Sequence, residues 1–253
     1  MTISVAQAEL FFLALTRILA TIIHVPVLGG RAIPNQVRIG LGLVLTICLV
    51  PWQNIPEATT IVGFLPFTLA IGKEILIGTL VGFAAELVFG AVQLASEAMG
   101  LESGFASSKL FNPALDESGS SYSQLFVIVA TMYFLAINGH HVVLIALQKS
   151  FTAVPLQGTI TLTDPTILLK MTSQMIQAGI ELALPVLAAL LLTDLSLGLL
   201  AKATPQIQVY FLGLPLKLGV SLAGMGLVLV MVLPMLSNLY GDLGNKMLML
   251  LEK

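Results

Sequence analysis

Long apolar stretches alternate with short polar connections along this chain of 253 residues. The apolar stretches are residues 8–28, 37–51, 61–97, 124–147, 167–200 and 207–236. A helix that crosses the hydrocarbon core of a bilayer needs about 20 mostly apolar residues. The pattern therefore predicts an all-α membrane-type protein of about six long apolar helices. The second stretch is short for a span, and the third and fifth are long enough to tilt, kink or continue past the bilayer.

Glycine and proline mark the connections between these stretches and several breaks inside them. The short turn Ala203-Thr204-Pro205 separates the last two stretches, which predicts an antiparallel helical hairpin. In the fourth stretch, Asn138-Gly139-His140 interrupts an apolar run and predicts a helix break. Prolines inside apolar stretches are expected to kink the helices that contain them: Pro66, Pro185, Pro215 and Pro234.

One long polar stretch, residues 94–124, is rich in serine and glycine and contains the break Asn112-Pro113. It is too long for a tight turn and too short for a domain. Loops of this length without regular structure of their own are usually functional or disordered. This stretch is therefore a candidate functional segment.

Composition supports a membrane protein and excludes several other classes. Hydrophobic residues make up 57% of the chain, charged residues only 9%, and the mean hydropathy is +1.00, whereas soluble domains contain about 25% charged residues. No basic patch of the kind that binds nucleic acid is present. The single cysteine, Cys48, excludes an intramolecular disulfide and a cysteine-based metal site. Arg17 lies inside the first apolar stretch, so we expect a retained helix rather than a signal peptide.

Several ionisable residues lie inside the apolar stretches, where charge is costly and often functional: Arg17, Lys73, Glu74, Glu86, Glu97, Glu181, Asp194 and Lys217. Spacings near whole helical turns place Glu74, Glu86 and Glu97 along one helix face. This stripe is either a water-lined wall or a set of contacts with donors on neighbouring subunits. The second interpretation is favoured, because no basic stripe in the chain matches it. Lys73 and Glu74 are adjacent and are not expected to pair well.

Asp194 and Lys217 are placed symmetrically about the turn between the last two stretches. In an antiparallel hairpin they would lie at the same height, and pairing would spare each charge an isolated burial. A structural pair that fixes the register of the hairpin is favoured over a proton relay.

The sequence contains no motif typical of catalysis or nucleotide binding. Gly72-Lys73 lacks the glycine spacing and the following Ser or Thr of a P-loop. Neither Gly-x-Ser-x-Gly nor His-Glu-x-x-His occurs. His140 and His141 are adjacent, so their side chains would diverge by about 100° on a helix and would not converge on one ion. We therefore expect a protein that is not an enzyme and has no cofactor and no metal.

Four segments have a specific family resemblance. They are VPVLGGRAIPNQVRIGLGLVL (25–45), MGLESGFASSKLFNP (99–113), FLAINGHHVVLIALQKSFTAVPLQG (134–158) and LALPVLAALLLTDLSLGLLAKATPQIQVYFLGLPLKLGVSL (182–222). In this order they resemble the FliR family of the flagellar and type III secretion export gate, nearly from end to end.

The resemblance implies a structural, pore-forming and gating subunit of the flagellar (type III) protein export gate, in the bacterial inner membrane at the flagellar basal body. Its partners would be FliP-type and FliQ-type subunits in a hetero-oligomer, an FlhB-type protein, membrane lipid and unfolded export substrates, without nucleic acid. It also implies a FliP-like helical part at 1–166, with a plug loop at about 98–123, and a FliQ-like hairpin and C-terminal tail at 167–253.

By position in the family, five residues would belong to a plug that faces the pore: Gly104, Phe105, Phe111, Asn112 and Pro113. Glycine lets the backbone pack closely, and phenylalanine side chains can fill a constriction and exclude water. The alternative is that Phe105 and Phe111 anchor the loop to the core of their own subunit.

A proton-coupled secondary transporter, with Glu86, Glu97 and Asp194 as the coupled sites, is the alternative function. An export-gate subunit should co-purify with FliP-type and FliQ-type proteins, whereas a transporter should behave as a self-contained monomer or homo-oligomer. A membrane-embedded enzyme is disfavoured by the missing catalytic motifs.

Overall fold

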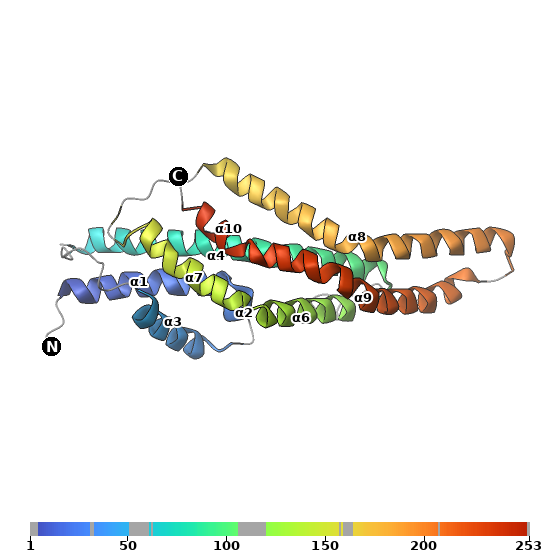
Figure 1. Cartoon of the computed structure of the whole chain (residues 1–253), viewed down its shortest axis with the longest axis horizontal. Helices are drawn as coiled ribbons and strands as arrows, with labels where there is room; N and C mark the ends of the chain where they lie inside the picture. Colours follow the sequence, from blue (N-terminus) through green and yellow to red (C-terminus); the bar gives the residue numbers. More distant parts are fainter. Residues whose placement is uncertain are drawn as a thin grey trace. The chain divides into compact units, whose positions relative to one another are not determined.

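The computed structural model describes residues 5–30, 33–50, 61, 63–105, 120–156, 158, 164–206 and 208–251, without the side chains of residues 210, 227–229 and 231. Within these residues the chain is helical and contains no strand (Figure 1). The helices are α1 (Val5–His24), α2 (Pro26–Gly29), α3 (Asn35–Leu49), α4 (Phe64–Glu102), α6 (Ser121–Ala136), α7 (Gly139–Ala153), α8 (Pro165–Ala203), α9 (Val209–Gly241) and α10 (Leu243–Met249).

Three of these helices, α1, α4 and α8, are long and apolar enough to cross a membrane, and α6 with α7 would together make a fourth crossing in the described part of the chain. The prediction of an all-α membrane-type protein is confirmed. The fourth predicted stretch consists of two helices, α6 and α7, which are separated at the residues where a break is predicted. Helix α10 has no counterpart among the predicted stretches. At 39 residues each, α4 and α8 are about 58 Å long, well beyond the roughly 30 Å of a hydrocarbon core.

Backbone geometry accounts for the break between α6 and α7. Asn138 has φ 58° and ψ 30°, a left-handed conformation that interrupts a right-handed helix. Pro185, Pro215 and Pro234 lie inside α8 and α9. Pro66 lies in the first turn of α4, where an amide needs no helical acceptor. The lost hydrogen bond expected at Pro66 therefore does not arise.

The chain divides into two compact units, each formed by segments that are distant in sequence. Unit 1 comprises residues 1–89, 138–172 and 241–253, and unit 2 comprises residues 90–137 and 173–240. The long helices α4 and α8 each contribute one part to unit 1 and one part to unit 2.

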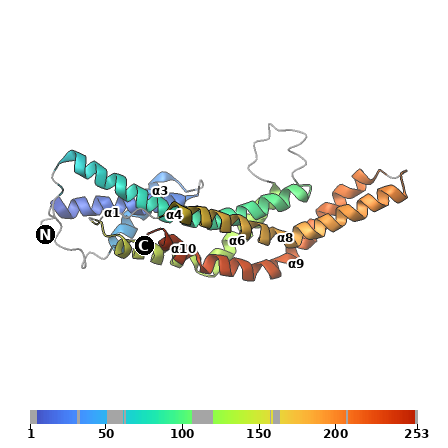
Figure 2. The ribbon, with the colours of Figure 1, turned by 90° about the horizontal axis from the view of Figure 1, so that it is seen from above.

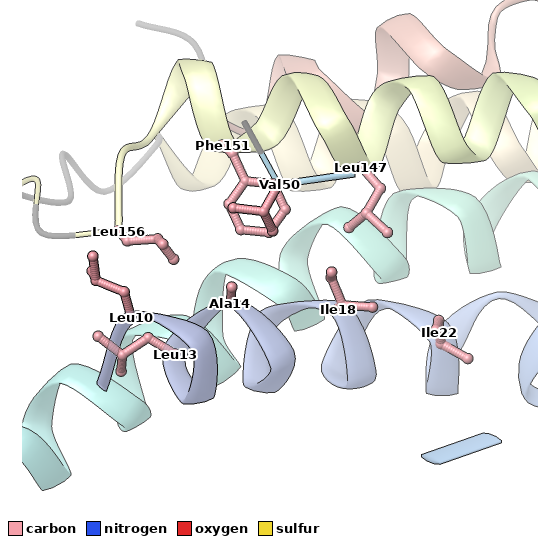
Figure 3. Packing of buried hydrophobic residues seen from close by; sticks show 9 residues of the cluster. All are labelled: Leu10, Leu13, Ala14, Ile18, Ile22, Val50, Leu147, Phe151 and Leu156. Carbon is pink, nitrogen blue, oxygen red and sulfur yellow. The ribbon is translucent and has the colours of Figure 1, made fainter. Parts of the chain in front are cut away.

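The core of unit 1 lies between α1 and α7 (Figure 3). Its α1 residues follow the i, i+3, i+4 pattern of one helix face: Leu10, Leu13, Ala14, Ile18 and Ile22. Leu147 and Phe151 of α7 pack in the same cluster, together with Val50 and Leu156 from the connections. Apolar periodicity therefore explains why α1 is held against α7.

In unit 2, the second part of α8 runs antiparallel to α9, as the sequence predicts (Figures 1 and 2). Leu197 of α8 lies against Gly213 of α9, and Asp194 lies against Lys217. Residue numbers of the contacting pairs decrease along α8 while they increase along α9, so the two helices are antiparallel. At the other end of α9, the rings of Phe134 and Tyr240 meet edge to face with centroids 5.0 Å apart.

Candidate functional site

Three charged residues join α1 and α4 inside unit 1: the buried Arg17 and Glu74 and the partly buried Lys73. We call them the Arg17 cluster. Arg17 Nε donates to Glu74 Oε2 at 2.6 Å, and both side chains are fully buried. Lys73 Nζ lies 3.3 Å from the other carboxylate oxygen of Glu74. The carboxylate thus lies between two cations, which offsets part of the cost of burying it.

The same two cations hold the end of α7 and the connection that follows it. Four carbonyl oxygens there accept hydrogen bonds from the Arg17 cluster: those of Ser150, Val154, Leu156 and Gly158. Arg17 Nη1 donates to the first two, at 2.9 and 2.8 Å. Lys73 Nζ donates to the last two, at 2.7 and 2.9 Å. Carbonyls at and beyond the end of a helix bear partial negative charge and often lack a backbone donor, so these two cations stabilise the end of α7 and the connection after it.

This geometry corrects two expectations about the charged residues. Lys73 and Glu74 do pair, because the flexible lysine stem reaches the neighbouring carboxylate although the two Cβ atoms diverge. Two of the three residues in the proposed carboxylate stripe also have partners in this chain rather than being left for donors on other subunits: Glu74 binds Arg17, and Glu86 Oε2 lies 2.9 Å from His24 Nδ1 of α1. Both partners belong to the same chain.

Close helix packing brings Arg17 and Glu74 together, and it depends on two glycines of α4 that the sequence analysis missed. A Cβ at Gly78 would lie 2.5 Å from the Arg17 carbonyl oxygen and 2.7 Å from Ala20 Cβ. A Cβ at Gly82 would lie 2.7 Å from His24 Cβ. Thr21 Oγ1 also donates to the Gly78 carbonyl at 3.1 Å. The pattern Gly78-x-x-x-Gly82 is the sequence signal for such contacts in membranes.

In unit 2, Lys217 of α9 contacts two carboxylates. Its Nζ lies 2.7 Å from Asp194 Oδ2 of α8 and 3.4 Å from Glu102 Oε1 at the end of α4. The two residues predicted to pair across the hairpin therefore lie together, and Glu102 is a partner that the sequence analysis did not name. The carboxylates are partly exposed, so the pair contributes less than a buried one.

We predict that Asp194→Ala and Lys217→Ala each lower the yield of folded protein, and that exchanging the charges in Asp194→Lys/Lys217→Asp restores part of it. Restoration should be partial, because the exchange brings a carboxylate at position 217 close to Glu102. The measurement is the monodisperse peak in size-exclusion chromatography of membrane extracts. An exchanged variant as defective as either single variant would contradict direct pairing.

The polar stretch has a tightly packed base in unit 2, which we call the loop base: Ser96, Gly100, Ser120 and Ser123. Ser120 caps α6, because its Oγ accepts a hydrogen bond from the Ser123 amide at 3.1 Å. Ser123 Oγ donates to the Ser96 carbonyl of α4 at 2.9 Å. Gly100 lies so close to the hydroxyls of Ser120 and Ser123 that a Cβ would collide with both. The chain thus leaves α4 and enters α6 beside the same small group of residues.

The histidines at the start of α7 lie side by side, with the ring centroids of His140 and His141 4.3 Å apart. Gly139, the first residue of α7, is buried. The described residues contain no group of three or more His, Cys, Asp or Glu side chains that could hold a metal ion.

Comparison with known proteins identifies the family. The family described as "Bacterial export proteins, family 1" matches residues 8–243. The chain is also 31% identical to the flagellar biosynthetic protein FliR of Pectobacterium carotovorum subsp. carotovorum, over 92% of this chain and 88% of that protein. The chain belongs to the FliR family of bacterial export proteins.

Two further relatives extend the comparison. Identity is 30% to the flagellar biosynthetic protein FliR of Escherichia coli (strain K12), over 94% of this chain and 90% of that protein. It is 29% to the FliR of Bacillus subtilis (strain 168), over 83% of this chain and 82% of that protein. The similarity to these FliR proteins therefore covers both units.

Of the five residues that the resemblance to the FliR family assigns to a plug, the structure describes Gly104 and Phe105. Gly104 follows the end of α4 with φ 85°, a left-handed conformation that favours glycine. The Phe105 ring lies 5.9 Å from the Tyr122 ring of α6, centroid to centroid. Phe105 therefore contacts its own subunit, as the alternative interpretation has it. Residues 111–113 (Phe111, Asn112 and Pro113) lie outside the described residues.

Proposed function

We propose that this chain is a structural, pore-forming and gating subunit of the flagellar (type III) protein export gate, through which unfolded flagellar subunits cross the bacterial inner membrane. The match of the export-protein family to residues 8–243 is the observation that supports this most directly. The names of the relatives supply the flagellar assignment, since each is a flagellar biosynthetic protein.

Exposed apolar side chains support assembly with lipid and with other subunits. Large apolar residues along the hairpin of unit 2 are more than half exposed: Leu191, Leu192, Leu195, Leu199, Phe211 and Leu212. Contiguous apolar surface of this kind normally marks a membrane or protein contact. We assign it to membrane lipid and to FliP-type, FliQ-type and FlhB-type partners, with residues 1–166 as the FliP-like part and 167–253 as the FliQ-like part.

Secretion in the bacterium that encodes the chain tests this proposal. Deleting the gene should leave flagellin in the cells and remove it from the culture medium. A plasmid copy of the gene should restore secretion of flagellin into the medium. Immunoblots of cells and medium measure both. A tagged copy should also co-purify with FliP-type and FliQ-type proteins. Normal secretion in the deletion strain, with a tagged chain that purifies as a self-contained monomer or homo-oligomer, would contradict the proposal and favour the proton-coupled transporter.

We infer that the polar segment at about 98–123 acts as a plug: the loop base holds its two ends, and the part between them moves. Its glycines and serines suit a segment that moves aside for a passing polypeptide. Deleting residues 106–112 should leave the assembly intact, because Ser96, Gly100, Ser120 and Ser123 stay in place, and should raise the conductance of the gate to small solutes. A matched control replaces residues 106–112 with seven Gly and Ser residues. Unchanged conductance in planar bilayers after the deletion would contradict the plug.

A further inference from the structure

A mixed polar and apolar cavity lies in unit 1, and none of its lining residues belongs to the Arg17 cluster. Its volume is about 680 Å³, and it is lined by the end of α7, the start of α8 and α10. Pockets for small ligands typically span roughly 300–1,000 Å³. We call it the α10 cavity.

The lining of the α10 cavity has two chemical sides. The polar side consists of Lys149 and Thr152 of α7 with Asn245 of α10, and the apolar side includes Ile167, Leu248 and Met249. Such a lining fits an amphiphile, whose charged group would meet Lys149 while its hydrocarbon part meets the apolar side.

The positive charge of Lys149 makes the α10 cavity suited to an anion. No carboxylate in the described part of the chain forms an ion pair with Lys149. The two aspartates within three residues of cavity-lining residues make other contacts. Asp164 Oδ1 accepts from the Thr166 amide at 3.0 Å, and Asp242 accepts from Asn245 Nδ2 at 3.3 Å and lies 3.8 Å from Lys246. Lys149 is thus left as an exposed cation beside the cavity.

The surface next to the cavity passes from apolar to basic within one helical turn. Ile145 is exposed and precedes Lys149 by four residues, so the two share a face of α7. On α8, the exposed Leu169 and Lys170 follow the cavity residue Ile167 closely. This change matches the boundary between hydrocarbon and headgroups, where lysines extend toward phosphate.

From these observations, the geometry points to a binding site for the headgroup of one anionic phospholipid at the α10 cavity. The phosphate accepts from Lys149, and the first acyl carbons lie against Leu248 and Met249. This assignment is independent of the proposed plug and requires only that the chain resides in a membrane.

Native mass spectrometry of the complete complex, purified in detergent and titrated with dioleoyl phosphatidylglycerol, tests the site. Lys149→Gln should weaken phosphatidylglycerol binding about fivefold, the effect expected of one lysine near a charged headgroup. Lys202→Gln, at an exposed lysine in the last turn of α8, removes the same charge elsewhere and should change nothing. Dioleoyl phosphatidylcholine should bind the wild-type complex more weakly than phosphatidylglycerol.

Three outcomes would overturn the inference. Equal binding of phosphatidylglycerol by Lys149→Gln and the wild type would exclude Lys149 as a ligand. Equal binding of the two lipids would exclude recognition of the anionic headgroup. Displacement of the lipid by millimolar glycerol phosphate would indicate a site for a free phosphate. If Lys149→Gln fails to assemble, Leu248→Ala, which shortens the apolar side of the α10 cavity, provides a second comparison: it should weaken phosphatidylglycerol binding, and unchanged binding would overturn the inference.

Discussion

Replacing Arg17 with methionine should remove most of the chain from the membrane fraction. The substitution leaves the fully buried Glu74 carboxylate with Lys73 alone. It also leaves the Val154 carbonyl without its side-chain donor and the Ser150 carbonyl with only the Val154 amide. Breaking a buried pair by removing one partner costs roughly 3–5 kcal/mol. Folded domains have only about 5–15 kcal/mol of stability in total. The loss is therefore large enough to expose most copies to degradation.

A double variant that also replaces Glu74 distinguishes the effect of an unbalanced buried charge from the effect of lost packing. Arg17→Met/Glu74→Met removes both buried charges and should recover part of the protein level, since apolar replacements of a buried pair are often neutral. Recovery should stay incomplete, because the carbonyls of Ser150 and Val154 still lack the hydrogen bonds that Arg17 donates. Lys202→Met removes an exposed charge and is the control. Immunoblots of membrane fractions and the midpoint of thermal unfolding of the purified complex measure the effect. A normal level of Arg17→Met would show that the Arg17 cluster does not stabilise unit 1.

The sequence predicts the long helices, but it predicts only some of the contacts between them. Apolar length predicts α1, α4, α8 and α9, because a run of that length folds as a helix in a membrane whatever it packs against. Contact across a short turn is also predictable: the turn after α8 fixes which residues of α8 and α9 face each other. Asp194 and Lys217 could therefore be paired from their positions alone.

Contacts between distant helices were not predictable in this way. Arg17 and Glu74 are 57 residues apart, and nothing in the apolar pattern states that α1 packs on α4. Glu74 was consequently expected to bind another subunit. Two clues were present in the sequence: a lone arginine in the first apolar stretch, and Gly78-x-x-x-Gly82 on the helix that contains Glu74. Together they indicate two helices whose backbones approach closely, with a charge pair between them.

The close approach of α4 to α1 gives a second large effect, which we expect for Gly78→Val. The new Cβ would lie 2.5 Å from the Arg17 carbonyl oxygen and 2.7 Å from Ala20 Cβ, and the first of these contacts is with backbone that no side-chain rotation can relieve. Overpacking typically costs about 1–3 kcal/mol, occasionally more. Here α4 must also move away from α1, which breaks the Thr21–Gly78 hydrogen bond and lengthens the Arg17–Glu74 pair one turn away.

Gly72 provides the matched control for this prediction. It lies on the same helix, and nothing comes within 4 Å of a Cβ built there, so Gly72→Val changes helix propensity by the same amount without a collision. We expect Gly72→Val to accumulate and unfold like the wild type, and Gly78→Val to be depleted from the membrane and to unfold at lower temperature. Ala20→Gly should recover some stability in a Gly78→Ala background, since it removes one of the two opposing atoms. If Gly72→Val and Gly78→Val behave alike, helix propensity rather than contact with α1 explains the loss, and close packing of α4 on α1 does not position the Arg17 cluster.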